Sequence, residues 1–274
     1  MFFASRCKIL FMVKKGEGIK YFRKYLRIAP LGLAVSRAIE AKHVASVKME
    51  RPILDVGCGF GEFARAFFDK KVEVGIDISD KELGSAKKCN KYKELKVADA
   101  KKLPFGDNSF KTVLSVSVLE HIDEVQPVLK EIYRVLKPGG KLVFTTNTDK
   151  INKLTFWPSR LETWDLPVLA DKYRLAYNSW FKHQTLWSKE KWQRELKKQG
   201  FKLLENKEIL GKKGTEMLDF FILTAWPSQI LKMILGKRVV FRPKWMEDFL
   251  VKKYGWVVEQ KEREGSNLFV VAEK

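Results

Sequence analysis

Residues 53–61 read Ile53-Leu54-Asp55-Val56-Gly57-Cys58-Gly59-Phe60-Gly61, and the rest of the chain is arranged around them. The first four form a short apolar strand that holds one carboxylate, and residues 62–70 have the spacing of a helix. Three alternating glycines lie between them, where a side chain would keep a ligand away from the backbone and where the turn can require a positive φ. A strand, a glycine-rich turn and a helix in this order are typical of a nucleotide-binding corner.

A second predicted strand, at residues 72–77, ends in an acid. Asp77 follows Asp55 by 22 residues, which is about the spacing at which a carboxylate reaches a ribose diol. A dinucleotide site would leave the N-terminus of the next helix free for a pyrophosphate, whereas Glu62 stands at that place here. Its negative charge repels phosphate and tolerates a cation, which argues against a dinucleotide.

Further motifs follow in a set order. They are Asp99-Ala100, Leu103-Pro104-Phe105, Ser117-Val118-Leu119-Glu120-His121-Ile122 and Arg134-Val135-Leu136-Lys137-Pro138-Gly139-Gly140. Together with the glycine corner, this series closely resembles the class I S-adenosylmethionine-dependent methyltransferases of the small-molecule and lipid type, the methyltransferase type 11-like branch. The resemblance is strong over about residues 51–146, and motifs in the right order are far more specific than any one of them.

Alternation of strands and helices between residues 52 and 146 predicts a parallel sheet. Strands are expected at 52–56, 72–77, 95–98, 111–116 and 141–146, and helices at 62–70, 80–90 and 125–136, with a turn at Pro138-Gly139-Gly140. A helix capped by Ser188 is predicted to end at Gly200, before strands at 201–209 and 267–272. The resemblance implies that the last strand runs antiparallel beside the fifth, which makes an α/β, Rossmann-like, seven-stranded mixed sheet with helices on both faces.

The chain divides into an N-terminal helical extension, residues 1–50, and a methyltransferase domain, residues 51–274. Two helices broken at Pro30 are expected in the extension, and they either cover the cofactor cleft or close the edge of the domain. Two connections, at about 147–188 and 211–263, are too long for plain loops and are interpreted as inserted, partly helical segments that cap the substrate.

The resemblance implies S-adenosylmethionine as the cofactor, with contacts at Asp55, Gly57, Cys58, Gly59, Asp77, Ile78, Asp99, Ala100 and Ser115. Asp77 is expected to accept hydrogen bonds from both ribose hydroxyls, and Asp99 to meet the adenine amino group. Ser115 ends the fourth strand, at the carboxyl edge where such sheets bind ligands. Each acid has a structural alternative: Asp55 holds the loop, Asp77 caps a helix, and Asp99 forms an Asx turn.

His121 is the candidate catalytic residue, because it follows the fourth strand, where the nucleophile is expected. As a general base it would remove a proton from the acceptor; alternatively it packs beside Glu120 and shapes the cleft. His183 lies in the first insertion and either faces the substrate or is structural, and His43 is interpreted as structural. Little covalent help is needed, since a sulfonium makes its methyl group electrophilic and the protein has to align the reactants and exclude water.

The formal net charge is +20, and most of the excess lies in the flanks: residues 1–51 carry 12 basic and 3 acidic residues, and residues 146–274 carry 25 and 16. Basic flanks suit nucleic acid, an anionic membrane surface or an anionic substrate, or they keep the protein soluble. No recognisable RNA module is present, and Ser115-Val116-Ser117-Val118 stands where nucleic-acid amino methyltransferases have Asp/Asn-Pro-Pro-Tyr/Phe. Three scattered cysteines fit neither a disulfide framework nor a zinc site, which predicts a reducing cytoplasm and no bound metal.

An apolar run at residues 217–235 is broken by Asp219, Pro227 and Lys232. A transmembrane helix needs about 20 apolar residues, so the run is interpreted either as two amphipathic pieces at the inner membrane face or as a lid over the acceptor. Both interpretations predict a hydrophobic acceptor. The predicted function is therefore methyl transfer to a small, hydrophobic or lipid-linked acceptor at oxygen or carbon, with an RNA methyltransferase and a non-catalytic cofactor-binding scaffold as alternatives.

Overall fold

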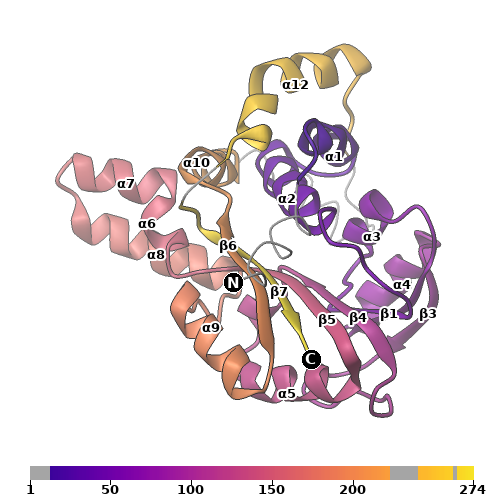
Figure 1. Cartoon of the computed structure of the whole chain (residues 1–274). Helices are drawn as coiled ribbons and strands as arrows, with labels where there is room; N and C mark the ends of the chain where they lie inside the picture. Colours follow the sequence, from indigo (N-terminus) through magenta and orange to yellow (C-terminus); the bar gives the residue numbers. More distant parts are fainter. Residues whose placement is uncertain (1–12, 223–239, 262–263) are drawn as a thin grey trace, which may run out of the picture.

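The computed structural model describes residues 13–222, 240–261 and 264–274 (Figure 1). A seven-stranded sheet lies at its centre, in the order β3-β2-β1-β4-β5-β7-β6. The strands are β1 (Ile53–Val56), β2 (Val72–Asp77), β3 (Tyr92–Val97), β4 (Phe110–Val116), β5 (Leu136–Asn147), β6 (Lys202–Ile209) and β7 (Asn267–Glu273). The first five strands are parallel, and β7 runs antiparallel to both β5 and β6. The predicted Rossmann-like mixed sheet is thus confirmed.

Two hydrophobic layers cover the two faces of the sheet, because successive strand residues point to opposite sides. On one side, Leu114 and Val116 of β4 pack with the N-terminal helices and with α3 (Glu62–Phe67) and α4 (Asp80–Lys88). On the other side, Val113 packs with α5 (Val125–Val135) and α9 (Lys189–Lys198). The order of the strands reverses between β1 and β4, which creates a crevice at their carboxyl ends.

Three boundaries predicted for the core differ from the structure by three residues or more. The helix predicted at 62–70 ends at Phe67, because the backbone of Phe68 is extended. The strand predicted at 95–98 begins at Tyr92, whose side chain is buried and whose backbone pairs with Val72 of β2. The predicted turn at Pro138-Gly139-Gly140 lies inside β5, which begins at Leu136 opposite Phe110. There the amide of Gly139 donates a hydrogen bond to the carbonyl of Lys274, 2.9 Å away. The residue that follows β7 thus pairs with this segment, a long-range contact that the local Pro-Gly-Gly pattern does not reveal.

The predicted cap of α9 is confirmed. The Ser188 hydroxyl accepts a hydrogen bond from the Lys191 amide at 3.3 Å, which satisfies one of the free amides of the first turn. The helix ends before Gly200, which has a φ of 92° that glycine tolerates best.

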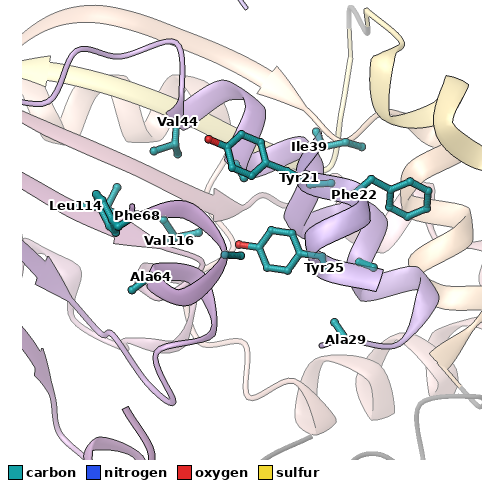
Figure 2. Packing of buried hydrophobic residues seen from close by; sticks show 14 of the residues in the cluster. Tyr21, Phe22, Tyr25, Ala29, Ile39, Val44, Ala64, Phe68, Leu114 and Val116 are labelled. Carbon is teal, nitrogen blue, oxygen red and sulfur yellow. The ribbon is translucent and has the colours of Figure 1, made fainter. Parts of the chain in front are cut away.

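The N-terminal helices α1 (Glu17–Leu26) and α2 (Leu31–Val44) meet at Pro30 and share the hydrophobic core of the sheet. Figure 2 shows Tyr21 and Tyr25 pointing from α1 toward the side where Ala64 and Phe68 lie, while Phe22 points the other way. All three aromatic side chains of α1 are at most 5% exposed. The extension therefore packs as part of the core.

Helices also fill both long connections. The first contains α6 (Ile151–Leu154), α7 (Phe156–Thr163) and α8 (Pro167–Trp180), and the second contains α10 (Lys212–Phe220) and α12 (Lys244–Glu259). In α10, Asp219 is fully buried and accepts hydrogen bonds from the Tyr173 hydroxyl at 2.5 Å and the Trp157 amide at 2.9 Å. In the predicted lid or interface element, Asp219 and Phe220 thus contact α7 and α8, whereas Met217, Leu218 and Phe221 pack against the main hydrophobic core. Residues 223–235 lie outside the described residues. Within the described ranges, every helix is too short or too polar to cross a membrane.

Candidate cofactor and active site

A cavity of about 760 Å³ opens at the carboxyl ends of β1, β2 and β4, where the strand order reverses. This volume is typical of a small-molecule site. Seven of the nine predicted cofactor contacts line it: Gly57, Cys58, Gly59, Asp77, Ile78, Asp99 and Ala100. Glu62 and His121 also face the cavity. The fold therefore brings together motifs that lie far apart in the sequence.

The turn after β1 has a shape that requires glycine. Gly57 has a φ of 73°, and a Cβ atom there would lie 2.4 Å from the Val118 side chain. The amides of Gly57 and Cys58 both donate to the Ile76 carbonyl at 2.9 Å, which ties the turn to the end of β2. The backbone of this turn consequently forms one wall of the cavity. A larger residue at Gly57 would collide with Val118 and disturb this wall.

Asp77 ends β2 and connects two loops. Its Oδ2 atom accepts a hydrogen bond from the Gly59 amide at 2.8 Å, and its Oδ1 atom accepts one from the Ser79 amide at 3.0 Å. The N-cap of α4 is Ser79, whose hydroxyl accepts from the Glu82 amide at 3.3 Å. Because each carboxylate oxygen accepts about two hydrogen bonds, Asp77 retains acceptor capacity toward the cavity, as a ribose diol requires.

Asp99 forms the predicted Asx turn and also lines the cavity, and its contact with the adenine amino group stays a prediction. Its Oδ1 atom accepts a hydrogen bond from the Lys101 amide at 2.8 Å, which is the Asx turn, while the residue also lines the cavity. Ile78 lies in the same cavity wall with 73% of its surface exposed. An exposed aliphatic side chain beside polar groups offers a surface on which a flat heteroaromatic ring can lie.

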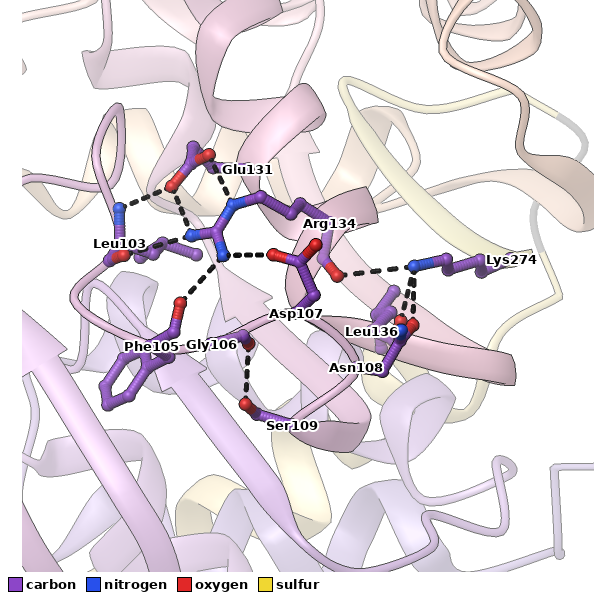
Figure 3. Close-up of polar contacts among 10 residues, drawn as sticks. All are labelled: Leu103, Phe105, Gly106, Asp107, Asn108, Ser109, Glu131, Arg134, Leu136 and Lys274. Atoms are coloured by element: carbon purple, nitrogen blue, oxygen red, sulfur yellow. Dashed lines mark hydrogen bonds and ion pairs between the residues drawn. The ribbon is translucent and has the colours of Figure 1, made fainter.

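Arg134 braces the loop that follows Asp99, a role that sequence reasoning missed. Its guanidinium donates to the carbonyls of Leu103 and Phe105 and to the carboxylates of Asp107 and Glu131, over 2.7–3.1 Å (Figure 3). Glu131 in turn accepts from the Leu103 amide at 2.8 Å. The sequence signals were the arginine at the start of the Arg-Val-Leu-Lys-Pro-Gly-Gly motif and the acid three residues before it, whereas the partners in the loop lie 27–31 residues away and are visible only in the fold.

Asp55 and Ser115 are placed away from the cavity wall. The Tyr92 hydroxyl donates to Asp55 Oδ2 at 2.6 Å, across the sheet, and burial raises the pKa of Asp55 to about 6. Ser115 is fully buried on the α5 side of β4, and its hydroxyl has no hydrogen-bond partner among the described residues. The geometry shows Asp55 linking β1 to Tyr92 of β3, and its predicted loop-holding role, like a direct cofactor contact by either residue, stays a prediction.

Two residues of the N-terminal helices, Tyr25 and Arg37, also line the cavity and were not foreseen as site residues. The Tyr25 hydroxyl is buried and has no hydrogen-bond partner within the described ranges, and burial raises the pKa of that group well above its usual value. Arg37 donates to Glu40 at 2.8 Å, and Glu40 also accepts from the Ser117 hydroxyl at 2.5 Å. A charged pair three residues apart in a largely apolar helix was the available signal. These contacts favour the prediction that the extension covers the cleft.

His121 lies at the end of the 3₁₀ turn after β4, with its ring stacked on that of His183 at 5.8 Å between centroids. Its Nδ1 atom is 3.3 Å from the Lys182 carbonyl. A carbonyl only accepts, so Nδ1 carries the hydrogen in this contact, and Nε2 is the basic nitrogen of the neutral ring. This arrangement is compatible with the predicted general base.

His183 has both ring nitrogens engaged. Nδ1 lies 3.0 Å from Asn178 Oδ1, and Nε2 lies 3.3 Å from Asn147 Nδ2. Since the first partner accepts and the second donates, the ring is neutral, and burial lowers the pKa of His183 to about 4. His183 therefore holds β5, α8 and His121 together and has no nitrogen left for a substrate.

Sequence comparison finds a family described as "Methyltransferase domain" that matches residues 54–144. Among curated proteins, the chain is 35% identical over 109 residues to the ubiquinone/menaquinone biosynthesis C-methyltransferase UbiE of Desulfotalea psychrophila, which covers 38% of this chain and 44% of that protein. It is 37% identical over 112 residues to the sterol 4-C-methyltransferase strm-1 of Caenorhabditis elegans, over 36% of this chain and 34% of that protein. The chain thus spans less than half the length of these relatives.

Solved structures share the fold over most of the chain. A SAM-dependent methyltransferase of Thermotoga maritima superposes with a TM-score of 0.57 at 21% identity, covering 89% of this chain and 91% of that one. The phosphoethanolamine N-methyltransferase 2 of Haemonchus contortus, solved with S-adenosyl-L-methionine, gives a TM-score of 0.52 at 22% identity, over 94% of this chain and 56% of that one. At these identities the likeness establishes the fold.

Proposed function

We propose that this chain, whose residues 54–144 form a class I S-adenosylmethionine-dependent methyltransferase domain, transfers a methyl group to a small hydrophobic or lipid-linked acceptor at oxygen or carbon. The observation that carries the proposal is the cavity at the strand-order reversal, with Asp77 at one wall and His121 at another. A nucleoside-binding corner and a basic nitrogen in one cavity are the two parts that methyl transfer to a protonated nucleophile requires.

The residues present fit the cofactor. Asp77 suits the ribose diol, and Ile78 and Asp99 suit the face and the amino group of adenine. Glu62 and Arg37 bring opposite charges into the same cavity, as the ammonium and carboxylate of an amino acid require, and the buried Tyr25 hydroxyl is one further donor. When bound, the cofactor supplies a methyl group made electrophilic by its sulfonium.

The acceptor side depends on His121 and on the apolar part of the cavity wall. His121 would take the acceptor's proton on Nε2 while its Nδ1–H remains on the Lys182 carbonyl. Ile28, Leu33 and Val118 line the same cavity and suit a hydrophobic acceptor. The curated relatives support this acceptor class, because their names specify quinone biosynthesis and sterols.

We place the enzyme in the cytoplasm and, through its excess of basic residues, at an anionic membrane surface. The net charge of +20 supports this location, since anionic lipid headgroups attract polybasic proteins. The same charge also suits RNA, so the assay has to include both acceptors.

Transfer of a labelled methyl group to lipid extract and to total RNA, measured side by side, tests the proposal. Label in the lipid fraction is the expected result, and label in RNA alone would contradict the acceptor class. Calorimetric binding of S-adenosylhomocysteine without any transfer would instead identify a non-catalytic scaffold.

Asp77→Ala should weaken S-adenosylhomocysteine binding by about 30- to 1000-fold, equivalent to roughly 2–4 kcal/mol, because it removes two charge-assisted hydrogen bonds to the ribose and also releases the Gly59 amide. Asp80→Ala is the matched control, since Asp80 is an exposed acid in the first turn of α4 that does not line the cavity. Calorimetry should find wild-type affinity in the control. Unchanged affinity in Asp77→Ala would refute the assignment of Asp77 to the ribose.

A further inference from the structure

Helix α12 presents a row of aromatic side chains to solvent. Trp245, Phe249 and Trp256 are 68%, 54% and 56% exposed, and their spacing of four and seven residues places them on one face. Phe241, just before the helix, is 88% exposed. Aromatic residues bury more apolar surface than most side chains, and a row of them left in water marks an interaction surface.

The opposite face holds α12 rigidly on α1, so the exposure does not come from a loosely attached helix (Figure 1). Val257 and Val258 are buried in the main core. Near the start of α12, Arg27 pairs with Glu247 at 3.0 Å, and at its end Glu259 accepts a hydrogen bond from the Ile19 amide at 3.0 Å. The aromatic row is therefore displayed by a helix with a fixed orientation.

The charges around the row are positive. Both acids near the start of α12 are neutralised by α1, Glu247 by Arg27 and Asp248 by Arg23 at 2.5 Å. Lys252 and Lys253 are exposed beside the aromatic residues, and neither forms an ion pair within the described part of the chain. Lys253 Nζ lies 5.6 Å from the centroid of the Phe249 ring.

We propose that this face of α12 docks the protein on an anionic phospholipid bilayer, with Trp245, Phe249 and Trp256 entering the headgroup region and Lys252 and Lys253 meeting lipid phosphates. The inference deepens the membrane-surface part of the proposed function and assigns it to residues. Tryptophan rings sit at the depth where headgroups meet acyl chains, and lysines reach from there to the surface. A rigid helix with an aromatic row and a basic border is the form of an interfacial membrane helix.

The segment just before α12 adjoins a part of the chain that lines the cavity. Arg242, immediately before α12, donates to the carbonyl of Leu26 and, at 2.8 Å, to that of Ala29. Ala29 lines the cavity together with Ile28 and Leu33, in the connection between α1 and α2 and the start of α2. The helix proposed to dock is thus joined directly to the apolar part of the cavity wall.

Vesicle co-sedimentation of the full chain tests the inference, with phosphatidylcholine vesicles that contain or lack phosphatidylglycerol. The wild type should sediment with the anionic vesicles, and raising the salt to about 0.5 M should weaken binding. Trp245→Ala/Phe249→Ala/Trp256→Ala and Lys252→Glu/Lys253→Glu should each lower the partition coefficient at least about tenfold. The matched control is Val168→Ala/Leu169→Ala/Leu175→Ala on α8, three apolar residues that are 50–71% exposed, and it should bind like the wild type.

Several outcomes would overturn the inference. They are equal sedimentation of the wild type and the α12 variants, loss of binding in the α8 control, and equal binding to neutral and anionic vesicles. A wild type that ignores vesicles and forms a dimer that the α12 variants cannot form would assign the face to a second copy of the chain. Binding of S-adenosylhomocysteine should be unchanged in every variant, which verifies the fold. Vesicle binding that persists without any methyl transfer would contradict the proposed function and leave this inference standing.

Discussion

The ring of His121 is oriented by a single backbone contact and a stacked neighbour. The Lys182 carbonyl accepts a hydrogen bond from Nδ1 of His121, and the ring of His183 stacks on the ring of His121. Lys182 and His183 follow α8, so the groups that orient the candidate base belong to the inserted segment at 147–188. A proton acceptor positioned in this way contributes typically about 100- to 10,000-fold to a rate.

His121→Ala should therefore lower kcat by about 100-fold or more and leave the affinity for S-adenosylhomocysteine nearly unchanged. Steady-state kinetics and calorimetry on the same preparation measure both quantities. His183→Gln is the comparison, since it disturbs the stacked ring without removing the base, and its kcat should fall less. Full activity of His121→Ala would remove this residue from the mechanism.

Asp55 bears a carboxylate in the interior of the sheet. Burial raises the pKa of Asp55 to about 6, against a value of about 4 in an unfolded chain, although the hydrogen bond from Tyr92 opposes this rise. Between these two values the folded protein holds the extra proton, so stability falls as the pH rises through that window. At neutral pH the folded state therefore contains an unfavourable buried charge.

Asp55→Asn should raise the free energy of unfolding at pH 7 by about 2–3 kcal/mol and have little effect near pH 4, because the amide keeps the Tyr92 hydrogen bond without the charge. Urea denaturation at both pH values measures this, with the exposed Asp80→Asn as control. An equal effect at both pH values would contradict the assigned charge. Loss of cofactor affinity in the same variant would support the predicted contact of Asp55 with the cofactor.

At the scale of elements, α5 holds the loop between β3 and β4 in place. The Arg134 fork spans backbone carbonyls and carboxylates of that loop and its own helix (Figure 3). A planar guanidinium can satisfy several acceptors at once, whereas an ammonium is a point charge with a different reach. The loop follows Asp99 and Ala100 directly, so its position affects the adenine side of the cavity.

Arg134→Lys should lower the free energy of unfolding by about 1–3 kcal/mol and weaken S-adenosylhomocysteine binding by about tenfold, because the loop loses most of its anchoring hydrogen bonds. Thermal denaturation and calorimetry measure the two effects. Arg194→Lys, on the exposed side of α9, serves as the control and should change neither quantity. A variant that loses stability but keeps full affinity would show that the loop does not position the cofactor.

At the scale of the whole molecule, the buried His43 and the half-buried His183 make the stability of the fold depend on pH. Burial lowers the pKa of His43 to about 3 and that of His183 to about 4. Both must be neutral in the folded state, so the stability that they contribute is present above pH ~6.5 and is lost as the pH falls toward 4. Between about pH 4 and 6, Asp55 makes the free energy of unfolding rise as the pH falls, which partly offsets the loss caused by the two histidines.

The free energy of unfolding should be about 2 kcal/mol lower at pH 5 than at pH 7, and the double variant His43→Gln/His183→Gln should show a flatter pH dependence. Urea denaturation across pH 4–8 measures the slope. Repeating the series in about 0.5 M salt separates this effect from repulsion within a chain of net charge +20. The same slope in the wild type and the double variant would contradict the assignment.

The sequence by itself determined the order of strands and helices in the core and the identity of the cofactor corner. Those features depend on local patterns: alternating apolar residues, glycines at 57 and 59, a serine cap at 188, and an acid 22 residues after Asp55. Each pattern reflects an interaction between residues close in the chain or a periodicity that one element imposes.

Tertiary structure alone decided which of the candidate side chains reach the cavity. Asp55 is the next-to-last residue of β1 and Asp77 is the last of β2, yet one meets Tyr92 in the interior and the other meets the glycine turn, because a side chain's direction depends on its register in the sheet. Tyr25 and Arg37 reach the site from helices that precede it, and α12 shows its aromatic row only once its other face is covered by α1. These relations join residues up to 240 positions apart, as Ile19 and Glu259 are, and such contacts form only when the chain has folded.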